Sequence, residues 1–107
     1  MTDKLGPPPQ PFTDFSALFP GIAKAWQTLS SSGSTGPLDD KTQRLIKLGI
    51  AIGSRSEGST HSATRKALSA GASPEEIYQV IALAASNVGL PSAVAAFTWV
   101  QDVVKKT

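Results

Sequence analysis

The sequence predicts an all-α fold, a bundle of five to six helices. Apolar residues recur at helical spacing, as at Ile77, Val80, Ile81 and Ala84. No segment of strand length alternates between apolar and polar residues, and helix start and stop signals separate the apolar segments. The length of 107 residues indicates one domain.

The first part of the chain divides into an arm and the beginning of the domain. Residues 1–11 are rich in proline and glycine, which predicts a flexible Pro-rich arm or a strap on a neighbouring subunit. Apolar residues at helical spacing then begin at Phe12, and Pro20 suits the first turn of a second helix. We therefore expect the helical domain to span residues 12–107, with a loop over residues 30–36.

Capping residues mark the later helices. Asp39 is a candidate N-cap, and Gly71 is typical of a helix C-terminus. Ser73, Pro74 and Glu76 form the pattern of a capping box with proline in the first turn. These signals predict a helix from residue 39, a helix that ends near residue 70 and a third helix from residue 74.

The segment 77–101 contains no charged residue and is long enough to cross a bilayer. Gly89 and Pro91 interrupt it near its centre. We therefore predict two buried helices joined by a turn, and no membrane partner.

Composition excludes several classes of function. The sequence has no cysteine, which rules out disulfides, thiolate metal sites and cysteine nucleophiles. It has a single histidine, so we predict no metal site and no cofactor. The net charge of +2 and the lack of a basic run argue against a nucleic-acid partner. No apolar segment near the N-terminus is typical of a secretory signal, and we expect a cytoplasmic protein.

Charged residues make up 17% of the chain, below the usual share of about 25%. A small protein with so few surface charges is expected to cover part of its surface with other subunits. The composition therefore favours a homo-oligomer.

Three segments carry a resemblance to a known family. They read DDKTQRLIKLGIAI over 39–52, TRKALSAGASPEEI over 64–77 and GLPSAVAAF over 89–97. In this order and spacing they resemble the carboxymuconolactone decarboxylase domain, which also includes AhpD-type alkylhydroperoxidases. The resemblance implies an AhpD-like helical bundle that assembles as a homotrimer or homohexamer.

The peroxidase branch of that family uses Cys-x-x-Cys, a histidine four residues later and a glutamate on the preceding helix. On this sequence those positions fall on Ser56, Ser59, Ala63 and Arg44. Serine hydroxyls are not ionised near neutral pH and cannot cycle through sulfenic acid and disulfide. We therefore predict no thiol peroxidase activity, and a peroxidase or oxidoreductase label would describe the fold and not this chain.

One constellation of polar residues suits acid/base chemistry. Glu57, His61 and Arg65 are spaced four residues apart and would share one helix face. A carboxylate beside an imidazole orients it for proton transfer, and a guanidinium holds a substrate carboxylate through two hydrogen bonds. We predict His61 and Glu57 as catalytic residues and Arg65 as a substrate-binding residue. The alternative is an ordinary row of charges on an exposed or interface helix.

Three further residues are weaker candidates for substrate binding. Arg44 takes the position of the family's glutamate, where it would bind an anion or pair with Glu57, or else lie in solvent. Ser56 and Ser59 would hydrogen-bond a ligand, or else cap the helix that starts near Glu57.

These residues support different classes of function. The decarboxylase branch of the family needs neither cofactor nor thiol, because it removes CO2 from a lactone acid with general acid/base groups. The first hypothesis is therefore a cofactor-free decarboxylase acting on a small carboxylated lactone or a related carboxylic acid. The alternative is a non-catalytic oligomeric protein that binds a small ligand or serves as an accessory subunit.

Overall fold

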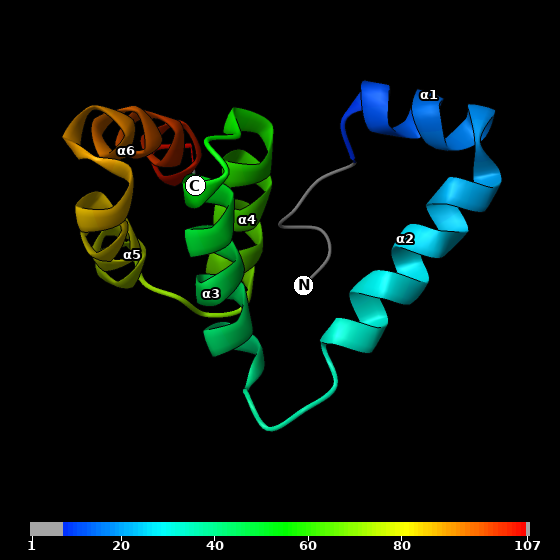
Figure 1. Ribbon diagram of the computed structural model, residues 1–107, viewed down its shortest axis with the longest axis horizontal. Coiled ribbons are helices and arrows are strands. Elements are labelled where there is room, and N and C mark those ends of the chain that lie inside the picture. The colour runs from blue at the N-terminus through cyan, green and yellow to red at the C-terminus, as the bar shows by residue number, and fades with distance from the viewer. Residues whose placement is uncertain (1–7, 107) are drawn as a thin grey trace. The chain divides into compact units, whose positions relative to one another are not determined.

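The computed structural model describes residues 8–106, and all regular secondary structure in that range is α-helical (Figure 1). This confirms the predicted all-α fold. No helix in the described range is long and apolar enough to cross a membrane. The helices are α1 (Gln10–Leu18), α2 (Pro20–Gly33), α3 (Asp40–Gly53), α4 (Glu57–Ser69), α5 (Pro74–Val88) and α6 (Leu90–Val104).

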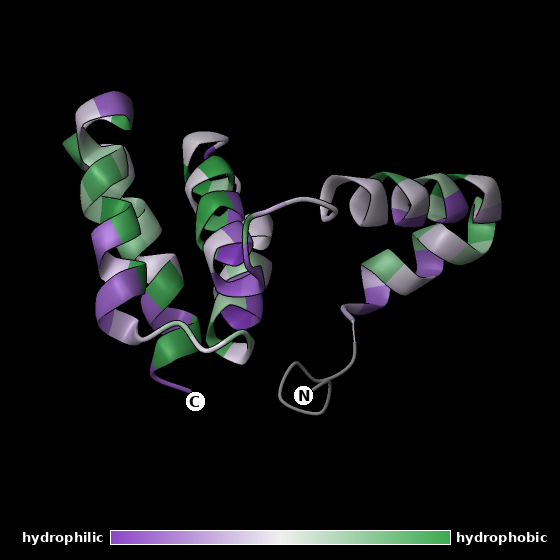
Figure 2. Cartoon of the chain, turned by 90° about the horizontal axis from the view of Figure 1, so that it is seen from below, coloured by the Kyte–Doolittle hydropathy of each residue, from purple (hydrophilic) through white to green (hydrophobic). Residues whose placement is uncertain are grey.

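The described residues fall into two compact units, one ending at Leu38 and one starting at Asp39. The first unit contains α1 and α2, and neither helix has a buried residue within it. Apolar residues nevertheless recur along both helices (Figure 2). Residues 1–7 of the predicted N-terminal arm lie outside the described residues, and α1 begins at Gln10.

The second unit contains α3–α6 and holds the hydrophobic core. Helix α3 packs against α4 and α5, and α6 packs against the same two helices. Fully burying one aliphatic side chain contributes about 1.5–3 kcal/mol, so this core supplies most of the stability of the unit. Its buried residues are Leu48, Ile52, Ala67, Ala72, Ile77, Ile81, Ala93, Ala96 and Val100.

The buried residues of helix α4 are all small. They are Thr60, Thr64 and Ala67, each completely shielded from solvent. The Thr64 hydroxyl donates to the carbonyl of Thr60 at 2.7 Å, which satisfies one buried polar group within the helix. Small side chains on this face let the backbones of α3 and α6 approach α4 closely.

Local hydrogen bonds confirm the predicted starts of α3 and α5, but the loop predicted over residues 30–36 is wrong in its first part, because α2 continues to Gly33. Asp39 accepts a hydrogen bond from the Thr42 amide at 2.8 Å and caps α3. Ser73 and Glu76 form the predicted capping box at the start of α5. Gly89, with φ of 90°, separates α5 from α6, so the uncharged segment 77–101 is two helices joined by a turn, as predicted.

The turn between α3 and α4 sets where α4 begins, at Glu57. Arg55 adopts a positive φ of 54°, which is uncommon for a residue with a side chain. Its guanidinium donates to the Ser92 hydroxyl at 3.3 Å and to the Val88 carbonyl at 3.5 Å. These contacts attach the turn to the junction of α5 and α6, two residues before Glu57.

The capping box also links α5 to α3 through a charge. The backbone N–H of Ser73 donates to Glu76 at 2.8 Å, and the Lys41 ammonium lies 3.0 Å from the same carboxylate. These two contacts hold the pKa of Glu76 below its ordinary value of 4.5. The backbone hydrogen bond from Ser73 has the larger effect and the Lys41 contact the smaller.

Acid should therefore weaken the fold through Glu76. A carboxyl whose pKa is lower in the folded state stabilises the protein above its unfolded pKa, and this stabilisation is lost as pH falls through the folded value. We expect Glu76→Gln to unfold at lower urea concentration than wild type at pH 7, with a smaller loss between pH 6 and pH 3. Urea unfolding across that pH range checks this, and Glu75→Gln is the matched control. Equal pH dependence in wild type and Glu76→Gln would contradict the assignment.

Candidate functional site

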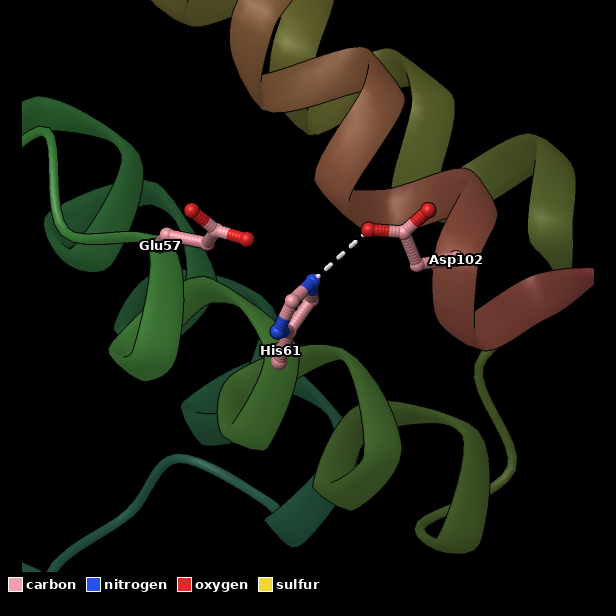
Figure 3. A group of neighbouring side chains, drawn as sticks. All are labelled: Glu57, His61 and Asp102. Atoms are coloured by element: carbon pink, nitrogen blue, oxygen red, sulfur yellow. Dashed lines mark hydrogen bonds and ion pairs between the residues drawn. The ribbon is translucent and has the colours of Figure 1, made fainter.

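The site is centred on His61, which is positioned by a residue from a distant part of the chain. Its Nε2 atom lies 3.0 Å from Oδ2 of Asp102 on α6, 41 residues later in the sequence (Figure 3). The His61 side chain is 25% exposed and Asp102 is 52% exposed, so the pair is open to solvent on one side. A neutral ring that donates from Nε2 to the carboxylate keeps Nδ1 as a proton acceptor.

Glu57 completes a cluster of three ionisable groups. It lies one turn before His61 on α4, and Figure 3 shows its carboxylate, like that of Asp102, near the Nε2 end of the imidazole. One ligand atom from each of the three side chains lies within 4.8 Å of the others. We call Glu57, His61 and Asp102 the carboxylate–histidine cluster.

A pocket of about 520 Å³ opens beside this cluster. Its volume is within the range typical of small-molecule sites. Two cationic side chains, Arg65 and Lys106, line it together with His61 and Asp102, while Leu68 and Val103 supply apolar surface. The full lining is His61, Arg65, Leu68, Ser69, Asp102, Val103 and Lys106, which we call the His61 pocket.

The charges of the His61 pocket suit a small anion. Arg65 offers a planar guanidinium that can bind a carboxylate through two hydrogen bonds. Lys106 follows the C-terminus of α6, where a cation also interacts favourably with the helix dipole. The pocket therefore combines anion-binding groups with a histidine and carboxylate pair that can exchange a proton.

A positively charged region continues onto neighbouring parts of α3 and α4. Burial lowers the pKa of the Lys66 ammonium, and the nearby cations Arg44, Lys47 and Arg65 lower it further. Additional positive charge is therefore disfavoured here, and an anion bound to this region would relieve the repulsion.

The structure separates the six predicted site residues into two groups. Glu57, His61 and Arg65 occupy one face of α4, and the last two line the same pocket. Arg44 lies on α3 with its Nε 3.7 Å from Oδ1 of Asp40 in the same helix, so it pairs with Asp40 and not with Glu57. It is not among the residues that line the His61 pocket.

Of the two serines at the cysteine positions that the resemblance implies, Ser56 has a structural role at the start of α4. Ser56 is the N-cap, and its hydroxyl accepts a hydrogen bond from the Ser59 amide at 3.2 Å. Ala63, at the family's histidine position, packs against the hydrophobic core. The positions that carry the peroxidase chemistry elsewhere therefore hold a helix cap and a packing residue in this chain.

Sequence reasoning missed Asp102 and Lys106. No periodic spacing links Asp102 to His61, because the contact joins two helices far apart in the sequence. One signal was present: Asp102 is the first charged residue after the uncharged segment 77–101 and the only one in α6. An isolated carboxylate in an otherwise uncharged helix needs a polar or charged partner, or solvent.

Comparison with known proteins places the sequence in a family. No curated protein and no solved structure matches the chain. The model of the carboxymuconolactone decarboxylase family matches residues 20–102, from the first residue of α2 to Asp102. Because that match covers well over half of the sequence, the chain belongs to the carboxymuconolactone decarboxylase family.

Proposed function

We propose that this protein is a cofactor-free enzyme of the decarboxylase type, acting on a small carboxylated lactone or a related acid in the His61 pocket. One observation carries the proposal: the paired His61 and Asp102 open into the same pocket as Arg65 and Lys106. Acid/base groups and anion-binding groups are the two components that such a reaction requires.

Each group has a role in the proposed reaction. Arg65 and Lys106 bind the anionic substrate. The C–C bond to the carboxylate breaks, CO2 leaves, and the electron pair passes into the conjugated carbonyl of the lactone. The two cations stabilise the negative charge that develops on that oxygen. Protonated His61 then delivers a proton to the carbon, while Asp102 orients the ring and stabilises its charged form. Water returns the proton to His61.

Glu57 would assist from the preceding turn of the helix that carries His61. One carboxylate oxygen of Glu57 lies within 4.8 Å of a ring nitrogen of His61 and of a carboxylate oxygen of Asp102. A second carboxylate near the imidazole limits the orientations that the ring can adopt. We therefore assign Glu57 as a positioning residue for His61.

Ligand binding is the first expected outcome. A lactone acid or small carboxylic acid that binds the pocket should raise Tm, because it binds only the folded state. Loss of a charge-assisted hydrogen-bond pair costs about 1.5–3 kcal/mol, so Arg65→Gln should weaken binding by roughly 10-fold to 100-fold. Thermal-shift titration against a panel of such acids checks this, with Lys105→Gln as the control for loss of one nearby charge. Equal affinities in Arg65→Gln and Lys105→Gln would contradict the binding role.

Turnover is the second expected outcome. General acid/base catalysis contributes roughly 10²- to 10⁴-fold, so His61→Gln should reduce kcat by about that factor with little change in KM. Arg65→Gln should mainly raise KM. Release of CO2 from the acids that bind is the measurement, with Tm recorded for each variant to confirm folding. Ligand binding by wild type without any CO2 release would instead support the non-catalytic ligand-binding alternative.

We also propose that the protein works as a homo-oligomer, a trimer or a hexamer. The unit formed by α1 and α2 buries no residue, and its large apolar side chains are about half exposed or more. These are Phe12, Phe15, Leu18, Phe19, Ile22, Trp26 and Leu29. In the other unit, an apolar groove of about 560 Å³ lies along α3 and α5, with Ile46 and Leu83 exposed in it. Apolar surfaces of this extent are typical of protein interfaces.

Disrupting the apolar face of α2 should therefore change the mass of the protein in solution. We expect wild type to elute as a trimer or hexamer and Trp26→Asp to dissociate, because a buried carboxylate at an interface is costly. Size-exclusion chromatography with light scattering measures this, and Gln27→Asp places the same charge at the next exposed position. A monomeric wild type, or equal behaviour of the two variants, would contradict the proposal.

A further inference from the structure

We infer that the carboxylate–histidine cluster of Glu57, His61 and Asp102 is a binding site for a divalent transition-metal ion, with Zn²⁺ as the best-suited probe. The single histidine in the sequence argued against any metal site, since the contribution of Asp102 is visible only in the folded chain. The inference goes beyond the proposed function and does not depend on it, because metal binding needs neither substrate nor turnover.

The distances in the cluster are close to those of a coordination shell. Zn²⁺ binds imidazole nitrogen and carboxylate oxygen at about 2.0–2.2 Å, so two ligand atoms of one tetrahedral ion lie roughly 3.3–3.6 Å apart. The three candidate atoms lie within 4.8 Å of one another, and the His61–Asp102 pair is already at 3.0 Å. Because Glu57 and Asp102 are exposed, small side-chain rotations suffice to bring all three onto one ion.

The donor set also suits the charge and chemistry of such an ion. Two carboxylates neutralise a divalent cation. A neutral imidazole supplies a nitrogen donor, which binds Zn²⁺ more strongly than it binds Mg²⁺. The ligands come from two helices, α4 and α6, that the hydrophobic core holds together. This support makes the site more rigid than three charged side chains on a single exposed helix.

The position of the cluster leaves room for further ligands. His61 and Asp102 line the His61 pocket, so an ion held by them would face that cavity and keep a coordination position for water or an anion. Three protein ligands with one remaining position is the usual arrangement of an accessible zinc site.

Metal binding would compete with the acid/base role of His61. The ion would take the place of the proton shared by His61 and Asp102, and a metal-bound imidazole cannot shuttle a proton through that nitrogen. In the proposed decarboxylase, Zn²⁺ would therefore act as a reversible inhibitor and not as the cofactor.

The test is calorimetric titration of Zn²⁺ into untagged, chelator-treated wild-type protein, followed by ¹H–¹⁵N spectra of the imidazole. Because the chain has one histidine, every imidazole signal reports His61. We expect one ion per chain, displaced His61 signals, and binding at least 10-fold weaker in both Asp102→Asn and Glu57→Gln. Mg²⁺ should bind at least 100-fold more weakly than Zn²⁺.

Matched controls separate the site from general surface binding. Glu75→Gln removes an exposed carboxylate of α5 outside the cluster and should bind Zn²⁺ like wild type. Circular dichroism and Tm confirm that each variant is folded. No saturable binding, or equal affinity in Asp102→Asn and wild type, would overturn the inference. A wild type that binds Zn²⁺ but releases no CO2 would leave the metal site standing and count only against the proposed enzyme.

Discussion

The close packing of α4 against α3 and α6 is the constraint on which the rest of the site depends. The buried face of α4 consists of Thr60, Thr64 and Ala67, whose small side chains fill little volume between the helices. Larger residues would force α6 away from α4, since protein interiors are already close-packed and extra volume produces strain. The 3.0 Å contact between His61 and Asp102 therefore depends on the small size of the buried residues of α4.

The same helix presents two different environments along its length. Its buried face consists of small side chains, two of which carry hydroxyls, and the hydroxyl of Thr64 bonds within the helix. Its accessible face carries Glu57, His61 and Arg65, and the Arg55 side chain connects the turn before that face to the junction of α5 and α6. At the first of the family's thiol positions Ser56 caps the helix, and the groups of the proposed site lie elsewhere on α4 and on α6.

Much of the fold was predictable from the sequence because local interactions decide helix ends. The capping box of Ser73 and Glu76 and the break at Gly89 depend on residues at most three positions apart, so their patterns are readable without a tertiary structure. The division of the described residues into two units was not predicted from these signals. Apolar periodicity marks a helix face as buried, but it does not say whether the same unit or another surface covers it, and α1 and α2 bury nothing within their own unit.

For the site, the sequence by itself determined that Glu57, His61 and Arg65 share one face of a helix, because helical periodicity alone brings residues four positions apart together. The lack of cysteine, also a property of the sequence alone, excluded thiol chemistry. Only the tertiary structure decided that Asp102 meets His61 and that Lys106 joins Arg65 in one pocket. The physical reason is that these contacts cross between helices whose approach is set by packing of the whole core, and no local spacing records that approach.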